Sequence, residues 1–249
     1  MKLTAFAFET IGISELGHVR KKNEDAFLIQ EELGLFLLAD GMGGGKAGRV
    51  AADLAIESFL FFSKEVFRGE KISTDQAKGL FVDGYQYINE QVFEKGQTDG
   101  DCEGMGTTFC ALLLLENEAI ISHIGDSRIY LYREDHLAQL TEDHTLLNEA
   151  LYRSTSEDEL PSKHILSRAI GPYPTVTPSI ETCVFKGGDL FLICSDGLTN
   201  SLTDSEIKEI VAQDGGCSEM GNHLMQVALN NGGRDNVTFI LVQIGDDQS

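Results

Sequence analysis

The stretch at residues 35–48 constrains the fold more than any other part of this sequence. It reads LFLLADGMGGGKAG, an apolar run that meets an acid at Asp40 and continues into a glycine-rich turn. A short apolar run bounded by glycine predicts a buried strand. Small residues recur at helical spacing over residues 47–62, which predicts a helix that can lie close against a sheet. We therefore expect Asp40 at the end of a strand, where its side chain leaves the core and can contact a ligand.

Three interpretations of this stretch are open from its own residues. The first is an ordinary strand, turn and helix without a ligand. The second is a dinucleotide fingerprint, which the spacing Gly43-x-Gly45-x-x-Gly48 matches, although Asp40 would repel a pyrophosphate beside it. The third makes Asp40 a metal ligand together with the Gly41 carbonyl, and it predicts further acids at strand ends.

Composition narrows the class of protein. The chain has 249 residues, of which 42% are hydrophobic and 24% charged, as is typical of a globular protein with a sizeable core. Its formal net charge is −21, from 19 basic and 40 acidic residues, so we expect no nucleic acid and no anionic membrane as a partner. No apolar run approaches the roughly 18 residues of a membrane span, and the N-terminus lacks a signal-peptide pattern. We expect a monomeric cytoplasmic protein with a single domain over residues 1–249.

The order of predicted strands and helices favours an α+β fold. Helices are predicted at residues 47–62, at 74–95 with Thr74 as N-cap, at 203–213 with a capping box of Thr203 and Glu206, and at 217–230. Strands are predicted at residues 4–14, 26–30, 35–40, 107–115, 118–124, 127–132, 136–140, 180–184, 189–194 and 237–244. Because strands and helices do not alternate, antiparallel sheets covered by helices are favoured over a doubly wound sheet. Residues 143–168 lack a strand pattern, and we expect a helical or mobile excursion there.

Lone aspartates recur beside the predicted strands, as the metal interpretation requires. Asp25 and Asp235 stand where strands open, Asp40 and Asp196 where strands close before glycine, and Asp126 in a turn between two strands. Carboxylates collected at one edge of a sheet sandwich repel one another unless cations neutralise them. No His or Cys recurs at metal-ligand spacing, and oxygen ligands suit Mg²⁺ or Mn²⁺. Arg20, near Asp25, could hold a phosphate group through its guanidinium. Metal ions together with a residue that binds phosphate suggest hydrolysis of a phosphate ester.

At these residues the sequence resembles the PP2C-type metal-dependent Ser/Thr protein phosphatases in their short bacterial form. The ordered motifs are RKKNED at 20–25, ADGMGG at 39–44, GTT at 106–108, GDSR at 125–128, LSRAIG at 166–171, SDGL at 195–198 and GGRDNVT at 232–238. The resemblance implies an αββα sandwich of two antiparallel sheets flanked by helices. It also implies that a water bridging the metals attacks phosphoserine or phosphothreonine without a phosphoenzyme.

The resemblance also assigns roles by position. Two tightly bound Mn²⁺ or Mg²⁺ ions and a weaker third are implied, and Arg20 would hold the phosphate. Asp40 would bridge the tight pair, and Arg20, Asp40 and Asp196 would form the catalytic set. The implied metal ligands are Asp25, Asp40, Gly41, Asp126, Asp196 and Asp235, with Glu24 and Asn236 supporting them from behind, and Asp126 with Asp196 would hold the third ion.

Two features depart from relatives of this family. Met42 stands where many eukaryotic members have a histidine, so that candidate proton donor is missing. Residues 144–168 match the flap beside the active site, but His164 stands where the family often has Asn. The expected partners are proteins phosphorylated on Ser or Thr and a cognate Ser/Thr kinase. The alternatives are a catalytically silent member that binds phosphoproteins and a nucleotide-binding protein that uses the glycine-rich turn.

Overall fold

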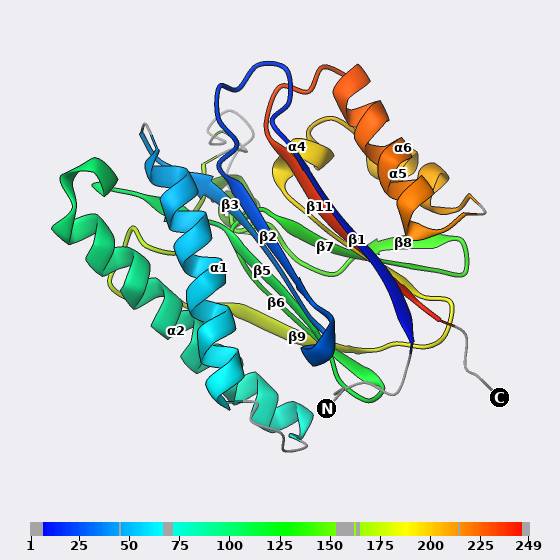
Figure 1. The fold of residues 1–249 in the computed structure, drawn as a ribbon, viewed down its shortest axis with the longest axis horizontal. Helices are drawn as coiled ribbons and strands as arrows, with labels where there is room; N and C mark the ends of the chain where they lie inside the picture. The colour runs from blue at the N-terminus through cyan, green and yellow to red at the C-terminus, as the bar shows by residue number, and fades with distance from the viewer. Residues whose placement is uncertain are drawn as a thin grey trace.

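Two β-sheets lie face to face, and helices cover the outer side of each (Figure 1). The computed structural model describes residues 7–44, 46–66, 72–152, 162, 165–213 and 215–245. All the strand pairs between named strands are antiparallel. The architecture confirms the predicted αββα sandwich.

Each sheet combines strands from distant parts of the chain. The five-stranded sheet has the order β1 (Phe8–Glu15), β11 (Val237–Ile244), β10 (Leu190–Cys194), β7 (Arg128–Arg133) and β8 (His136–Gln139). The six-stranded sheet has the order β2 (Asp25–Gln30), β3 (Leu35–Met42), β5 (Phe109–Leu114), β6 (Glu118–Ile124) and β9 (Ser179–Val184), and the short β4 (Gly106–Thr107) pairs with the end of β3.

The helices lie in two groups (Figure 1). Those beside the six-stranded sheet are α1 (Ala47–Val66) and α2 (Thr74–Thr98), and those beside the five-stranded sheet are α5 (Asp204–Val211) and α6 (Cys217–Asn230). Shorter helices are α3 (Leu146–Tyr152), α4 (Asp196–Thr199) and two 3-10 turns at Glu31–Leu33 and Gly100–Cys102. In the described part of the chain, none of the helices has the length and apolar character needed to cross a bilayer.

The sequence of strand β3 is apolar without alternation because both faces of the strand are buried. Leu35, Leu37 and Ala39 pack in the core between the six-stranded sheet and helices α1 and α2. Phe36 and Leu38 point the other way, into the core between the two sheets. Successive side chains of a strand point to opposite faces, so a strand covered on both sides reads as a continuous apolar run.

The alanines of α1 bring that helix close to the sheet. Ala51, Ala52 and Ala55 are completely buried in the core beneath it. On α2, a Cβ atom at Gly84 would lie 2.9 Å from the Phe59 ring of α1, so glycine is needed where the two helices touch. This packing leaves the glycine-rich turn before α1 at one end of the sandwich.

Several predicted boundaries differ from the structure. The N-cap of α2 is Ser73, whose side chain forms a capping box with Gln76; the prediction of Thr74 was wrong by one residue because both hydroxyls suit the role. The capping box of Thr203 and Glu206 is confirmed. Strand β3 continues past Asp40 to Met42, because β4 pairs with its last two residues.

Two more predictions concern the ends of β1 and the flap. The first three residues of the strand predicted at 4–14 lie outside the described residues, and β1 begins at Phe8. The excursion predicted at 143–168 contains α3, which confirms its helical part. Residues 153–161 and 163–164, including His164, lie outside the described residues.

Candidate active site

Two aspartates face each other on neighbouring strands at one end of the six-stranded sheet. The antiparallel register of β2 and β3 places Asp25 directly opposite Asp40. Directly paired residues point to the same face of a sheet, and like charges there are destabilising. The Asp40 backbone is held by Thr108: its N–H donates to Thr108 Oγ1 (2.9 Å), and its carbonyl accepts the Thr108 N–H (2.9 Å). The fold therefore fixes two carboxylates side by side.

Three further aspartates come from the five-stranded sheet and its loops. Asp196 follows β10 and begins α4, Asp126 lies in the turn between β6 and β7, and Asp235 lies just before β11. Strands β7, β10 and β11 are direct neighbours, so these three positions lie at the same end of the sandwich. An open cleft of about 630 Å³ is lined by Arg20, Glu24, Asp40, Gly41, Met42, Gly43, Thr108, Asp126, Ile165, Leu166, Asp196, Asn200 and Asp235.

The carboxyl groups at this cleft affect one another's charge. Burial raises the pKa of Asp40 well above its usual value, and the charges of Asp25 and Asp196 raise it further. Burial also raises the pKa of Asp25 to about 6, against hydrogen bonds that favour the charged form. The pKa of Asp126 rises to about 7, first through burial and then through the charge of Asp196. Ionising all of them together requires positive charge nearby.

Within the part of the chain that the structure describes, two buried carboxylate oxygens at this end have no hydrogen-bond partner. Asp25 is 1% exposed; its Oδ2 accepts a hydrogen bond from Ser195 Oγ (2.9 Å), but its Oδ1 has no partner. Glu24 Oε1 is likewise buried and unpartnered. An unpaired buried carboxylate is costly, and a hard cation offers the missing partner. The donors are all oxygen, so the residues fit Mg²⁺ or Mn²⁺.

The side chains alone do not form a closed cage for an ion. Among the described residues, no three His, Cys, Asp or Glu side chains come together as a ready set of ligands for one ion. Mg²⁺ commonly binds through one or two carboxylates and keeps several waters. An open set of oxygens, completed by a backbone carbonyl such as that of Gly41 and by water, is therefore compatible with these cations.

Arg20 supplies positive charge at the cleft wall. It lies in the loop between β1 and β2, and its Nη2 donates to Asp235 Oδ2 at 2.6 Å. This hydrogen bond raises the pKa of Arg20, and the charges of Asp40 and Glu24 raise it as well. The side chain is half exposed, so the guanidinium can reach a ligand in the cleft.

Asn236 holds the loop that carries Arg20 and Glu24. Its Oδ1 accepts the Glu24 N–H (2.9 Å), and its Nδ2 donates to the carbonyls of Leu16 (3.0 Å) and Lys22 (2.9 Å). The amide therefore holds the backbone of this loop behind the cleft; the family resemblance places Asn236 outside the ligand set.

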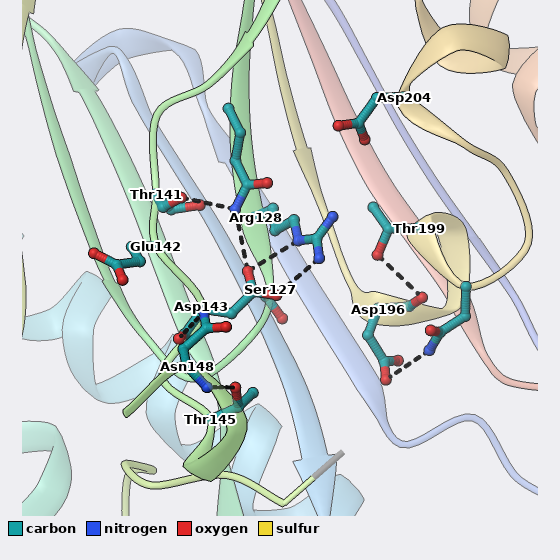
Figure 2. A network of polar contacts seen from close by, with 12 residues as sticks. Ser127, Arg128, Thr141, Glu142, Asp143, Thr145, Asn148, Asp196, Thr199 and Asp204 are labelled. Atoms are coloured by element: carbon teal, nitrogen blue, oxygen red, sulfur yellow. Dashed lines mark hydrogen bonds and ion pairs between the residues drawn. The ribbon is translucent and has the colours of Figure 1, made fainter. Parts of the chain in front are cut away.

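A polar recess continues from the cleft toward the flap. The Arg128 guanidinium donates two hydrogen bonds to the Asp143 carboxylate, from Nε to Oδ1 at 2.9 Å and from Nη2 to Oδ2 at 2.8 Å (Figure 2). On the other side, Asn200 Nδ2 donates to Asp196 Oδ2 (3.0 Å). The recess has a volume of about 200 Å³ and is lined by Asp126, Arg128, Asp143, Thr145, Leu147, Asn148, Asp196, Thr199 and Asn200.

Sequence reasoning missed the hydroxyl residues that anchor the acids. Thr108 Oγ1 bonds Ser127 Oγ at 2.7 Å, which links the strand beside Asp40 to the turn of Asp126. Ser195 donates to Asp25 while accepting the Thr238 N–H (3.1 Å). A signal was present for Ser127 and Ser195, which lie next to Asp126 and Asp196 in their motifs, whereas the motif of Thr108 contains no acid.

The comparisons with known proteins agree with this arrangement. The chain matches the family described as protein phosphatase 2C over residues 17–237. It is 34% identical to the protein phosphatase PhpP of Streptococcus pneumoniae over 245 residues, covering 95% of this chain and 98% of that protein.

Solved structures match as well. The serine/threonine phosphatase Stp1 of Staphylococcus aureus is 34% identical with a TM-score of 0.86, covering 98% of this chain and 97% of that one. The catalytic domain of the phosphatase PstP in complex with two manganese ions is 32% identical with a TM-score of 0.83, covering 96% of this chain and 99% of that one.

A family match of this extent defines the class of protein: a metal-dependent phosphoprotein phosphatase. The chain belongs to the protein phosphatase 2C family.

Membership in this family does not support the other interpretations. The glycine-rich turn follows β3, whose neighbours β2 and β5 are both antiparallel to it. A dinucleotide fingerprint requires a parallel βαβ unit, and Gly45 of the fingerprint lies outside the described residues. The catalytically silent alternative is not supported either, since silence would require lost carboxylates and the predicted ones are all present.

Proposed function

We propose that this protein, a serine/threonine protein phosphatase of the protein phosphatase 2C family, hydrolyses phosphoserine and phosphothreonine at a centre of two Mn²⁺ or Mg²⁺ ions formed by its cleft aspartates. The observation that carries this proposal is the arrival of four aspartates from two sheets at one cleft, with Asp25 buried directly beside Asp40 and, among the described residues, carboxylate oxygens of Asp25 and Glu24 left without a hydrogen-bond partner. The family match and the relative solved with two manganese ions support it.

Each cleft residue receives a role within the proposal. Asp40 would contact both ions, because it lies centrally among the acids whose charges raise its pKa. The remaining ligands of the pair would be the Gly41 carbonyl, Asp196 and Asp235, with Asp25 at the edge and Glu24 and Asn236 behind. Asp126 and Asp196, which both line the polar recess, would hold a weaker third ion.

The bound ions would supply an activated water as nucleophile and neutralise charge on the phosphoryl oxygens. The chain's own groups position the substrate. A guanidinium carries five N–H donors, so Arg20 can hold Asp235 through Nη2 and phosphoryl oxygens through its other donors. Thr108 and Ser195 keep the carboxylates in place through the hydrogen bonds described above. Met42 lines the cleft but has no proton to donate.

The expected substrates are proteins phosphorylated by a cognate Ser/Thr kinase. The chain would act as a cytoplasmic monomer with one catalytic domain over residues 1–249. The strongly acidic composition, with a net charge of −21, favours phosphoprotein segments that are not themselves highly acidic.

Phosphate release from phosphoserine and phosphothreonine peptides tests the proposal. Purified protein is stripped with EDTA and assayed with and without added Mn²⁺ or Mg²⁺. We expect release only with added cation, and loss of release in Asp235→Ala. Asp135→Ala is the matched control, since this exposed aspartate lies in the β7–β8 turn and pairs with Lys208. Peptide binding without phosphate release would contradict the proposal and restore the silent alternative.

A further inference from the structure

His144 is a buried histidine that the proposed chemistry does not use. It lies between the Arg128 partner Asp143 and helix α3, at the base of the flap, and is 7% exposed. Its ring stacks on that of His123, with centroids 4.4 Å apart and an interplanar angle of 18°. The stacking fixes the plane of the imidazole, so its two nitrogens point in defined directions.

His144 satisfies both backbone groups of Gly125. The His144 N–H donates to the Gly125 carbonyl (2.9 Å), and the Gly125 N–H donates to His144 Nδ1 (3.3 Å). Gly125 directly precedes Asp126, has a φ of 102°, and could not carry a Cβ atom, which would lie 2.6 Å from Thr108 Cγ2. The turn that presents Asp126 is thus held by one residue from another loop.

The hydrogen bonds decide which nitrogen carries the proton. A backbone N–H can only donate, so Nδ1 must present its lone pair to Gly125 and the proton must lie on Nε2. Nε2 then donates to Ser179 Oγ at 2.9 Å. Arg168 Nη1, which can only donate, also lies 3.3 Å from Nε2; with the proton on Nε2, this nitrogen bonds the nearer Ser179 Oγ, and Arg168 contributes its positive charge but no hydrogen bond to the ring.

The surroundings keep the imidazole neutral. Burial first, and then the neighbouring His123 and Arg168, lower the pKa of His144 to about 3. A second proton would sit on Nδ1, facing the Gly125 N–H, and would break that hydrogen bond. His144 is therefore an acceptor for the turn and has no role as a proton donor.

The backbone of the same residue also holds the flap. The His144 carbonyl accepts the Ser167 N–H (2.9 Å), and the Leu146 N–H donates to the carbonyl of Ile165 (2.8 Å), so the first residues of the flap bond to its last ones. Ile165 and Leu166 line the catalytic cleft. His144 therefore lies between the cleft wall of the flap and the turn of Asp126.

We propose that His144 is a positioning residue for the third cation site, its Nδ1 fixing the Gly125–Asp126 turn so that Asp126 faces Asp196. The inference rests on the proposed function, which gives Asp126 and Asp196 the weaker ion. Residues behind metal ligands typically change metal affinity about 10–100-fold when they are mutated. Losing the Nδ1 acceptor should therefore weaken the third site and leave the tight pair bound.

Two amide substitutions separate the functions of the two ring nitrogens. In His144→Asn the amide oxygen lies where Nδ1 was and can still accept the Gly125 N–H. In His144→Gln the amide nitrogen lies where Nε2 was, so the bond to Ser179 is kept and the bond to Gly125 is lost. Ser179→Ala is the matched control, since it removes only the Nε2 partner. Asp126→Ala defines the loss of the third site itself.

Mn²⁺ binding to the metal-stripped protein is measured by calorimetry, and amide exchange of residues 125–126 is measured in the same metal-free samples. We expect His144→Gln to weaken the low-affinity Mn²⁺ site about tenfold and to speed exchange at Gly125. His144→Asn and Ser179→Ala should stay close to wild type in both readouts. The imidazole is not expected to transfer a proton to the leaving group. The ratio of kcat for a phosphoserine peptide to kcat for p-nitrophenyl phosphate should therefore be the same in His144→Gln, His144→Asn, Ser179→Ala and wild type.

Wild-type Mn²⁺ affinity and wild-type exchange in His144→Gln would overturn the proposal. If His144→Gln does not fold, His144→Asn is the deciding variant. Loss of the weak Mn²⁺ site in His144→Asn, to the extent seen in Asp126→Ala, would then overturn the proposal. If Asp126→Ala itself keeps the weak site, the assignment of that site under the proposed function fails instead, so the two failures are distinguishable.

Discussion

Asp25 and Asp189 are equally buried, each 1% exposed, but they lie at opposite ends of the sandwich and in opposite electrostatic settings. Asp189, just before β10, accepts a fork from Arg133 (Nε–Oδ1 2.8 Å, Nη2–Oδ2 2.6 Å) and the Lys186 N–H (2.8 Å). Arg49 Nη1 donates to the Asp25 backbone carbonyl (3.0 Å), but among the described residues no cationic side chain bonds the Asp25 carboxylate, and its Oδ1 has no partner. A buried carboxylate needs compensation, so the end of the molecule that carries the Arg133–Asp189 pair (the paired end) is structural, and the cleft end, where Asp25 lacks such a pair, is built for cations.

The largest expected effect is on activity, which mutations at the cleft end should abolish and a mutation at the paired end should leave nearly unchanged. Asp196→Ala should lower kcat on p-nitrophenyl phosphate about 10³-fold or more, because the ions supply both the nucleophile and charge stabilisation. Asp40→Asn should do the same. Asp189→Asn, the matched change at the paired end, should keep kcat per folded molecule within about twofold. Steady-state assays at saturating Mn²⁺ measure all three, and equal losses at the two ends would break the comparison.

The next largest effect is on the free energy of unfolding, which should depend strongly on the arginine–aspartate pair at the paired end. Arg133→Leu leaves Asp189 buried without its cation, and breaking such a pair from one side should cost about 3 kcal/mol of unfolding free energy. Urea unfolding measures the loss. Lys186→Ala is the control: its pair with Glu134 is exposed on both sides and should contribute less than about 1 kcal/mol. A loss in Arg133→Leu no larger than in this control would show that Asp189 needs no partner.

Arg20 and Asp235 form an arginine–aspartate pair at the cleft itself, and this pair should behave differently from Arg133–Asp189. Arg20 and Asp235 are both partly exposed, so Arg20→Ala should change stability little. It should raise KM for a phosphoserine peptide, with a loss of about 1.5–3 kcal/mol in transition-state binding if the guanidinium holds phosphate. Lys46→Ala removes an exposed cation of the nearby glycine-rich turn as a control. Unchanged KM and kcat in Arg20→Ala would make Arg20 an ordinary surface residue.

The smallest effect concerns the pH dependence of the metal-free protein. The folded pKa of Asp25, about 6, lies above the value of about 3.9 expected in the unfolded chain. The folded state therefore binds the proton more tightly, and this stabilisation is complete below about pH 4 and is lost as pH rises through about 6.

In EDTA, wild type should thus lose about 2 kcal/mol relative to Asp25→Asn between pH 4 and pH 7. The amide of the variant can still accept the Ser195 hydroxyl and does not titrate. Thermal melts at both pH values measure the difference, and saturating Mn²⁺ should remove it in wild type. A constant difference across this range would show that the Asp25 carboxylate is already compensated.

The strands and the acids beside them could be predicted because their signals are local. The run at residues 35–39 is apolar because both faces of β3 are covered, and a glycine-rich turn marks its end. The same locality explains the errors: Ser73 and Thr74 are both good caps, and only the hydrogen bond to Gln76 selects the first. The extension of β3 to Met42 depends on β4, which is far away in sequence.

The contacts that complete the candidate site join residues far apart in the chain. Arg20 reaches Asp235, and Asn236 reaches Glu24, across more than two hundred residues. Ser195 reaches Asp25 across 170 residues. Spacing in the sequence carries no information on such contacts. The family resemblance gave Arg20, Glu24, Asp235 and Asn236 their roles, and Ser195 was missed.

Calorimetric titration of the EDTA-stripped protein with Mn²⁺ is the direct test of whether the aspartates at the cleft form a cation centre. We expect two tightly bound ions and a weaker third in wild type, loss of tight binding in Asp196→Ala, and an unchanged isotherm in Asp189→Asn. Activity should return in step with occupancy of the tight sites. No tight Mn²⁺ binding, together with full phosphatase activity after exhaustive EDTA dialysis, would contradict this expectation.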